Sequence, residues 1–418
     1  MLIKRHLLHD LQQHLSQPEI TLLTGPRQSG KTTLLHLLQE QVARDGSPTL
    51  FLNLDIEENA AYFSSQSKLI RYIRAMAGEQ RAYVFIDEIQ RKENAGLFLK
   101  GLYDSRLPYK FVVSGSGSLE LKEKIKESLV GRKRIFELGP VNIEEFLAYR
   151  TGYRFEERLG DWIQLAPPEL EPLLLEYLNF GGYPRVVLAD SYAEKTAVLE
   201  EILGSYLERD IRILLQLEKS QAFSLMLRLI AGRIGTITNY SSLAAETALA
   251  QQTLKKYLWY AEKTFVLRSV APFFRNPMKE LIKAPEYYFV DLGMRNHSLR
   301  MAGKFQHLSE MGAVFENFIY HLLHNRYATV VNPIKYWRTK DKAEVDFVVE
   351  KGLQPLPVEV KCQSLRKPSL SRSFRNFVNT YAPEEAWVVN LDYRDEVRIG
   401  DTRVRFRPWY ELGVGGRV

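Results

Sequence analysis

The feature that most constrains the fold of this chain is an octapeptide with the pattern G-x-x-x-x-G-K-[ST]. An apolar run at residues 20–24 precedes it, and a helical pattern at 31–43 follows it. A glycine-rich loop between a strand and a helix can wrap closely around a phosphate, and the first amides of the helix bind anions. We therefore predict a nucleotide site rather than a chance match, with Lys31 at the β- and γ-phosphates and the Thr32 hydroxyl on Mg²⁺. The predicted nucleotide-binding residues are Gly25, Pro26, Arg27, Gln28, Ser29, Gly30, Lys31, Thr32 and Thr33.

The first third of the chain alternates short apolar runs with helical patterns. The apolar runs occupy residues 20–25, 48–55, 82–88 and 110–116, and they are rich in residues that favour strands. Runs that are apolar on both faces are typical of a parallel sheet covered by helices. The pattern therefore predicts an α/β domain of the nucleotide-binding type.

Two carboxylates, Asp87 and Glu88, end the run at 82–88. Alone, such a pair would be a solvated turn, but the phosphate-binding loop in the same domain favours a hydrolytic role. We expect Asp87 to hold Mg²⁺ through water and Glu88 to polarise the attacking water. The next run ends at Ser116, which is either a sensor of the γ-phosphate or a turn former. Because the chain has no Asn-Lys-x-Asp motif for guanine, we expect ATP.

A cluster of basic residues surrounds Arg132 in the segment LVGRKR at 129–134. An arginine just beyond the sensor strand could reach the γ-phosphate of a neighbouring subunit and stabilise the charge that develops there. The alternative is a solvated basic turn, and the sequence leaves both interpretations open.

The α/β pattern gives way to helical patterns after Pro140. They suggest a small helical bundle up to residue 218, with one break at 181–184. Two short helices around a small-residue turn and then two β-rich runs follow, which is the order of a winged helix-turn-helix. A long helical pattern and six β-rich runs complete the chain. We therefore expect four segments, at 1–139, 140–218, 219–296 and 297–418.

The last segment contains a second group of chemically active residues: Glu316 on the helix, Asp346 in one strand, and Glu359 and Lys361 on the next. Glu359 and Lys361 are two residues apart, so they point to the same face. Carboxylates some 4 Å apart repel by on the order of 4 kcal/mol at an effective dielectric of 20, and a divalent metal offsets this. We expect Asp346 and Glu359 to hold Mg²⁺ while Lys361 positions or activates water. The alternative is a row of polar residues on a half-exposed strand.

Composition narrows the remaining classes of protein. The single cysteine, Cys362, excludes a disulfide framework and a multi-cysteine zinc site, and it fits a reducing cytoplasm. No stretch reaches about 18 apolar residues, so we expect no membrane span. The N-terminus lacks the apolar run of a signal peptide, so we expect no export.

The net charge of +7 is concentrated in one segment. Residues 219–296 hold eleven Lys and Arg against five acidic residues, which is 11 − 5 = +6. This excess coincides with the predicted winged helix, and it favours DNA as a partner over an ordinary solvated surface. Lys255 and Lys256 are the first residues to test.

Several blocks of the chain resemble a family of bacterial and archaeal AAA-type ATPases with a C-terminal domain of unknown function. The blocks are GPRQSGKTTLL, YVFIDEIQ, VVSGSGSL and LVGRKRIFELGPVNIEEFL, then FGGYPRVV, YLERDI, KAPEYYFVDLGM, VFENFI, YWRTKDKAEVDFVV and LPVEVK. The resemblance implies an AAA+-like P-loop NTPase core with a helical lid, a winged helix, an end like a PD-(D/E)xK nuclease, and assembly into a homo-oligomer or ring. It also implies ATPase roles for Lys31, Thr32, Asp87 and Glu88 and a nuclease pattern at Glu316, Asp346, Glu359 and Lys361.

These observations predict a cytoplasmic α/β protein that hydrolyses ATP with Mg²⁺ and processes or remodels DNA. Two alternatives stay open. One is an ATP-driven switch whose nuclease-like domain does not cut. The other is a signalling or partner-remodelling module without a role in nucleic-acid chemistry.

Overall fold

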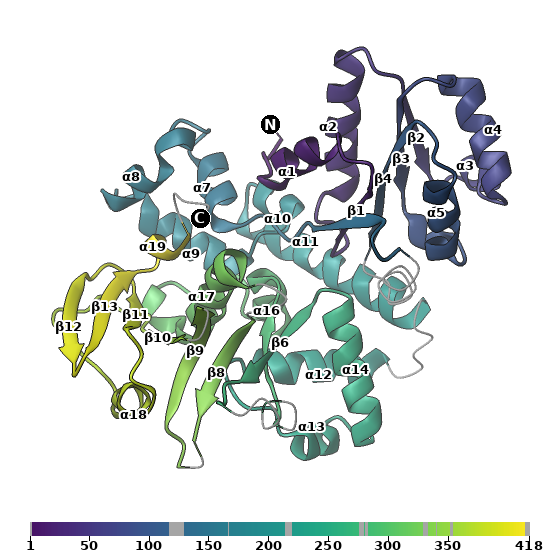
Figure 1. Ribbon diagram of the computed structural model, residues 1–418. Coiled ribbons are helices and arrows are strands. Elements are labelled where there is room, and N and C mark those ends of the chain that lie inside the picture. Colours follow the sequence, from purple (N-terminus) through teal and green to yellow (C-terminus); the bar gives the residue numbers. More distant parts are fainter. Residues whose placement is uncertain are drawn as a thin grey trace. The chain divides into compact units, whose positions relative to one another are not determined.

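The computed structural model describes residues 2–116, 129–165, 167–213, 220–275, 280, 283–328, 333–339, 341–351 and 354–413. The chain divides into two compact units, and each has its own sheet (Figure 1). The first unit comprises Met1–Val141, Gly204–Leu217 and Trp259–Val266; the second comprises Asn142–Leu203, Glu218–Leu258 and Leu267–Val418. This grouping is coarser than the four segments expected from the sequence, which remain a prediction.

A five-stranded parallel sheet forms the centre of the first unit, in the order β2-β3-β4-β1-β5. Four of its strands occupy the predicted apolar runs, and their parallel arrangement confirms the predicted sheet. The fifth strand pairs with β1 at the edge of the sheet, and its mostly polar sequence, KRIFE, carries no strand signal. The strands are β1 (Ile20–Gly25), β2 (Thr49–Asn53), β3 (Ala82–Asp87), β4 (Tyr109–Ser116) and β5 (Lys133–Glu137).

Helices cover both faces of this sheet. Successive strand residues point to opposite faces, and the apolar side chains on each face form a core with the helices there. Leu22 and Val84 belong to a core with residues of α4 and α5, whereas Leu23 and Phe85 belong to a second core with residues of α1 and α2. Figure 1 shows α2 on one side of the sheet and α4 and α5 on the other. The helical elements are α1 (Leu7–His14), α2 (Lys31–Arg44), α3 (Glu57–Tyr62), α4 (Gln66–Ala77), the 3₁₀ turn η1 (Ile89–Arg91), α5 (Ala95–Asp104) and the π-helical stretch η3 (Tyr206–Ile213).

An eight-stranded mixed sheet forms the second unit, in the order β12-β13-β11-β10-β9-β8-β6-β7. Six of its strands occupy the six predicted C-terminal runs, and β6 and β7 form the predicted antiparallel hairpin. Strand β6 also pairs in parallel with β8, so the hairpin and the C-terminal strands share one sheet across the expected boundary at 296. The strands are β6 (Leu267–Pro272), β7 (Glu286–Phe289), β8 (Ile334–Arg338), β9 (Glu344–Lys351), β10 (Gln354–Val360), β11 (Glu385–Asn390), β12 (Asp395–Ile399) and β13 (Thr402–Pro408).

Helices α9 and α16 meet at the break that the sequence showed at residues 181–184. The carboxylate of Asp291, which caps α16, accepts a hydrogen bond from the amide of Gly182 at 2.8 Å. A side chain at Gly293 would lie 2.0 Å from the carbonyl oxygen of Phe180, so the two helices can approach this closely only through glycine. Most of the residues expected to form a lid, 142–203, belong to the second unit, whereas residues 204–217 belong to the first.

The predicted pair of short helices before the hairpin is present as α13 and α14, and α14 continues into residues of the first unit. Within the described ranges, no helix has both the length and the hydrophobicity that crossing a membrane requires. The helical elements after residue 141, apart from η3, are α7 (Ile143–Arg150), η2 (Glu156–Arg158), α8 (Leu159–Gln164), α9 (Leu170–Phe180), α10 (Pro184–Leu188), α11 (Tyr192–Ser205), α12 (Ser220–Ala231), α13 (Tyr240–Glu246), α14 (Gln251–Lys263), α16 (Leu292–Ser298), η4 (Leu308–Glu310), α17 (Gly312–Tyr327), α18 (Arg372–Tyr381) and α19 (Tyr410–Gly413).

Candidate functional site

The loop between β1 and α2 has the backbone conformation of a tight anion-binding turn. Gly25, Gln28 and Gly30 all have positive φ, at 149°, 59° and 95°. A side chain at Gly25 would lie 2.1 Å from the carbonyl oxygen of Leu138. Only glycine fits this position, because it combines a positive φ with backbone contact. Gly30 then places the free amides of the first turn of α2 at the end of the loop.

The two predicted halves of the nucleotide site are in direct contact. The hydroxyl of Thr32 donates to Oδ2 of Asp87 at 2.7 Å. Asp87 is 1% exposed and accepts two further hydrogen bonds, from the hydroxyl of Ser114 and from the amide of Glu88 at 3.1 Å. Because β4 lies between β1 and β3, its Ser114 can reach the end of β3. Three donors therefore orient one buried carboxylate beside the loop.

The ammonium of Lys31 lies against the loop that it follows. It donates to the carbonyl oxygens of Gly25 at 3.1 Å and Pro26 at 2.6 Å, and the residue is 6% exposed. These partners belong to the start of the loop itself. A phosphate bound by the loop amides would therefore be within the influence of a positive charge that little solvent screens.

Glu88 has the features of a general base. Its φ of 56° lies in the left-handed region, which non-glycine residues seldom adopt and which is often found at functional sites. Burial raises the pKa of Glu88 and the charge of Asp87 raises it further, whereas Lys31 lowers it. Nε2 of Gln90 donates to its Oε2 and holds the carboxylate in place. A carboxyl with a raised pKa accepts a proton more readily near neutral pH.

The predicted roles of Ser116 and Arg132 have less support from the contacts in the structure. Ser116 ends β4 and pairs with Gly25, but its side chain lies outside the described part of the chain. Ser114, two residues earlier, contacts Asp87, and the two-residue period of a strand could have indicated it as an equal candidate. Arg132 donates from Nε to Oδ1 of Asp104 at 2.7 Å, so its guanidinium is held by a residue of α5 in its own chain.

Arg5 is a functional candidate that the sequence did not reveal. Its Nη1 donates to the carbonyl oxygen of Ser29 at 2.9 Å, and its Nη2 donates to those of Gly139 at 2.8 Å and Pro140 at 3.0 Å. The guanidinium thus clamps the phosphate-binding loop to the segment after β5. No pattern in the sequence distinguishes this arginine, because its partners are backbone carbonyls far along the chain.

The structure brings Asp346, Glu359 and Lys361 together at the ends of β9 and β10, which pair in antiparallel register through Phe347 and Val358. Oδ2 of Asp346 accepts from the amide of Val360 at 2.7 Å. Oε1 of Glu359, a residue that is 6% exposed, pairs with the ammonium of Lys361 at 2.5 Å.

Glu316 acts on Asp346 through its charge and is connected to a further acid, Glu286, by a tyrosine. The hydroxyl of Tyr288 lies 2.7 Å from Oε1 of Glu316 and 3.3 Å from Oε2 of Glu286, so two carboxyl groups share one hydroxyl. Burial, then the charge of Asp346, raises the pKa of Glu286 to about 8, and burial raises that of Glu316 to about 7. Burial, then Glu316, raises the pKa of Asp346. Glu286 was not predicted, because a single acid in EYYF carries no signal.

These carboxyl groups are not arranged as a preformed metal site. Among the residues that the structure describes, no three His, Cys, Asp or Glu side chains are placed so that they could hold a metal ion. Asp346 and Glu359 accept hydrogen bonds from the amide of Val360 and the hydroxyl of Ser371, respectively. The predicted metal role of Asp346 and Glu359 remains a prediction.

The predicted DNA-binding lysines lie on α14. Lys255 and Lys256 are both exposed, and the ammonium of Lys255 lies 5.0 Å from the ring centroid of Tyr240 on α13. The order of α12, α13, α14 and the β6–β7 hairpin agrees with the predicted order of elements. A role in DNA binding remains a prediction.

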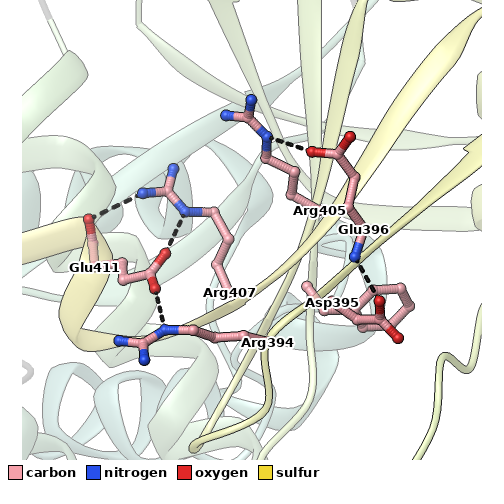
Figure 2. A pocket seen from close by; sticks show the side chains of 7 residues that line it. Arg394, Asp395, Glu396, Arg405, Arg407 and Glu411 are labelled. Atoms are coloured by element: carbon pink, nitrogen blue, oxygen red, sulfur yellow. Dashed lines mark hydrogen bonds and ion pairs between the residues drawn. The ribbon is translucent and has the colours of Figure 1, made fainter. Parts of the chain in front are cut away.

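A surface hollow of about 350 Å³ lies between β12, β13 and α19 (Figure 2). Its arginines are paired: Nε of Arg394 and Nε of Arg407 lie 2.6 Å and 3.0 Å from the carboxylate of Glu411. Nε of Arg405 lies 3.2 Å from Oε2 of Glu396. Because each of these positive charges already has a carboxylate partner, the hollow is not suited to bind an anion.

Three known families match successive parts of the chain. Residues 17–147 match the family described as an AAA domain. Residues 171–304 and 311–410 match two domains of unknown function, DUF8612 and DUF4143. The N-terminal part is therefore AAA-type ATPase-like, which confirms that part of the resemblance. The descriptions of the other two families name neither a winged helix nor a nuclease.

Three relatives that span most of the chain are described as uncharacterized proteins. One from Mycobacterium tuberculosis is 28% identical over 369 residues, covering 88% of this chain and 75% of its own length. One from Methanocaldococcus jannaschii is 26% identical over 399 residues, covering 93% and 85%. One from Haemophilus influenzae is 24% identical over 371 residues, covering 86% of each.

Solved structures with some similarity include DnaA proteins. AMPPCP-bound DnaA from Aquifex aeolicus gives a TM-score of 0.28 at 12% identity, covering 62% of this chain and 86% of that one. The replication initiator DnaA bound to AMPPCP and single-stranded DNA gives 0.28 at 13% identity, covering 63% and 90%. At these values, the likeness does not assign an activity.

Proposed function

We propose that this chain is a Mg²⁺-dependent ATPase that acts on DNA. The observation that carries the ATPase is the hydrogen bond of 2.7 Å between Thr32 and Asp87. It places a hydroxyl oxygen and a carboxylate, both of which are ligands that Mg²⁺ prefers, beside a loop whose amides bind phosphate. This donor set fits Mg²⁺, and Thr32 and Asp87 would hold it. When bound, the ion would neutralise charge on the β- and γ-phosphates.

The remaining residues of the site supply binding and proton transfer. The loop amides and Lys31 bind the phosphate oxygens and offset their charge. Glu88 orients a water in line with the γ-phosphorus and accepts its proton as the new phosphorus–oxygen bond forms. The bond between the γ-phosphorus and the bridging oxygen breaks, and ADP and phosphate leave.

The ATPase is tested with two variants that separate binding from chemistry. Lys31→Ala should abolish binding of a fluorescent ATP analogue. Glu88→Gln should bind it as tightly as wild type and hydrolyse ATP at least about 100-fold more slowly, because general-base catalysis contributes about 10²–10⁴-fold. Arg71→Gln, an exposed residue of α4, is the matched control. Unchanged turnover in both site variants would refute the assignment.

DNA is the partner that the charge distribution favours. Lys255 and Lys256 are exposed on the second helix of the predicted helix-turn-helix. The rate of ATP hydrolysis should rise when single-stranded, duplex or branched DNA is added, and the substrate that stimulates most identifies the preferred structure. If no form of DNA changes the rate of ATP hydrolysis and the protein binds no DNA at low salt, the signalling alternative is favoured.

A second candidate activity is metal-dependent cleavage of DNA by the C-terminal carboxylates. It is supported by Asp346 and Glu359 on adjacent strands, with Lys361 paired to Glu359 at 2.5 Å. Because these groups do not form a ready metal site, they would have to rearrange when an ion binds. Wild-type protein should nick plasmid DNA with Mg²⁺ or Mn²⁺, and Asp346→Ala should not, while both hydrolyse ATP. If the plasmid stays intact in every case, the remaining alternative is an ATP-driven switch whose C-terminal domain does not cut DNA.

The ATPase should also assemble into a homo-oligomer, in which Arg132 of one subunit reaches the nucleotide of the next. This role requires that the pair between Arg132 and Asp104 opens. Light scattering with and without ATP measures the assembly, and Arg132→Ala should slow ATP hydrolysis without changing the mass. If Arg132→Ala hydrolyses ATP at the wild-type rate, the residue is part of a solvated turn.

A further inference from the structure

A basic segment joins β10 to α18 in the second unit. Residues 360–383 contain five cationic side chains and no acidic one. We call residues 361–375 the basic strap. Its cationic residues are Lys361, Arg366, Lys367, Arg372 and Arg375.

The start of the strap is tied to the sheet and to the carboxylate site. The amide of Lys361 donates to the carbonyl oxygen of Val389 at 2.8 Å, which fixes the strap to the end of β11. The hydroxyl of Ser371, which caps α18, donates to Oε2 of Glu359 at 3.1 Å. The strap therefore begins and returns at Glu359.

The apolar side chains of the strap face inward, and four of its five cations are exposed. Leu365 and Leu370 pack against the core that contains Phe374. The remaining exposed side chains are polar or charged apart from Pro368. The cations that are exposed are Arg366, Lys367, Arg372 and Arg375.

These four exposed cations have no ion-pair or hydrogen-bond partner for their side chains among the described residues. The arginines of the hollow in Figure 2 differ, since each is held by a carboxylate. Part of the charge counted in residues 219–296 is also neutralised or buried: Arg233 pairs with Glu246 at 2.6 Å, and Arg295 is 7% exposed. Within the part of the chain that the structure describes, the strap therefore presents a group of like charges without a carboxylate partner, which suits an external anion.

We propose that the basic strap binds the phosphodiester backbone of DNA and leads it to Glu359 and Lys361. The inference rests on the proposed DNA role and adds the surface that performs it. A group of unpaired, exposed cations within ten residues suits the repeated phosphates of DNA, since each contact releases a counterion. A membrane surface is a poorer match, because membrane-binding segments also insert apolar side chains and the strap exposes almost none.

The test measures binding of a fluorescent 30-base-pair duplex and a single strand by anisotropy, at several salt concentrations, in EDTA and without nucleotide. Two double variants remove strap charges: Arg366→Gln with Lys367→Gln, and Arg372→Gln with Arg375→Gln. Each should lower the slope of log affinity against log salt by about 1.8 for the duplex, at about 0.9 for each phosphate that the variant no longer neutralises. The control is Arg398→Gln with Arg403→Gln, which removes two exposed charges that face each other across β12 and β13.

The outcomes separate the strap from the wider DNA role. If wild type binds DNA and both strap variants keep its slope, or if the control falls as far as they do, the strap proposal is wrong while DNA binding stands. If wild type binds no DNA at 50 mM salt, the proposed DNA role fails, and the strap proposal with it. Weaker binding to phosphatidylserine vesicles with unchanged DNA binding would instead assign the strap to a membrane. Thermal unfolding midpoints equal to wild type show that the variants are folded.

Discussion

Replacing Arg5 tests whether the N-terminal arginine clamps the phosphate-binding loop. Its guanidinium makes three hydrogen bonds of 2.8–3.0 Å, one to Ser29 in the loop and two to Gly139 and Pro140. At about 1 kcal/mol for each half-buried hydrogen bond, Arg5→Gln should remove up to about 3 kcal/mol of interaction. Arg5→Lys should lose less of this interaction energy. It should still lose some, because an ammonium lacks the planar fork that reaches both backbone segments at once.

The loss can appear in two measurable quantities. If the clamp orders the loop, ATP binding must order it instead, and the dissociation constant should rise by up to about 100-fold, since each 1.4 kcal/mol is tenfold. If the clamp mainly joins the loop to the segment after β5, the free energy of unfolding should fall by a similar amount. Titration with a fluorescent ATP analogue measures the first quantity, and urea denaturation the second.

The control for Arg5 is Arg71→Gln, which removes an exposed arginine of α4 in the same unit and should change neither quantity. An unchanged dissociation constant with a reduced free energy of unfolding would show that Arg5 supports the fold and not the nucleotide loop. If both quantities equal the wild-type values, the three hydrogen bonds contribute nothing measurable and the reasoning is refuted.

Three further substitutions probe other close contacts. Gly25→Ala would place Cβ 2.1 Å from the Leu138 carbonyl oxygen at a φ of 149°, so ATP binding should be lost in an equilibrium titration. Gly46→Ala, which also has a positive φ, of 79°, but meets no atom within 4 Å, should bind ATP normally. Thr32→Val removes the donor to Asp87, and the Mg²⁺ concentration for half-maximal hydrolysis should rise at least about tenfold; an unchanged requirement would exclude Thr32 as a ligand. Burial raises the pKa of Glu286 from 4.5 to about 8, so between these values the folded state holds a proton that the unfolded state has released. The free energy of unfolding should therefore fall as pH rises from 5 to 8, by on the order of 1 kcal/mol per pH unit, and Glu286→Gln should flatten this dependence in urea titrations.

The local sequence predicted most of the first unit, because the patterns that indicate its strands and its loop each span only a few residues. The apolar runs predicted four parallel strands, and the loop motif predicted the turn that holds Gly25 and Gly30. The sensor serine shows the limit of this reasoning. Both Ser114 and Ser116 lie on the same strand with the same parity, and the register of β3 with β4, which pairs Ile86 with Val113, places Ser114 at the level of Asp87.

The second unit depended more on contacts between distant residues. The pattern around Asp346, Glu359 and Lys361 predicted strands that pair, and β9 and β10 do. It did not indicate Glu286, because this residue joins the group only through the sheet that β6 and β7 complete. Nor did it show that, within the described residues, the four exposed cations of the basic strap are unpaired while those beside Glu411 are paired, since pairing depends on which acids fold nearby.

By itself, the sequence determined the elements whose cause is local: the glycine loop, the apolar strands, the amphipathic helices and the carboxylates at strand ends. Period and turn chemistry act over a few residues, so they can be read directly along the chain. The tertiary structure alone decided that Thr32 meets Asp87, that Arg5 holds Ser29, and that Tyr288 joins Glu286 to Glu316. Each of these contacts joins residues on separate elements, and the packing of a whole core selects such contacts.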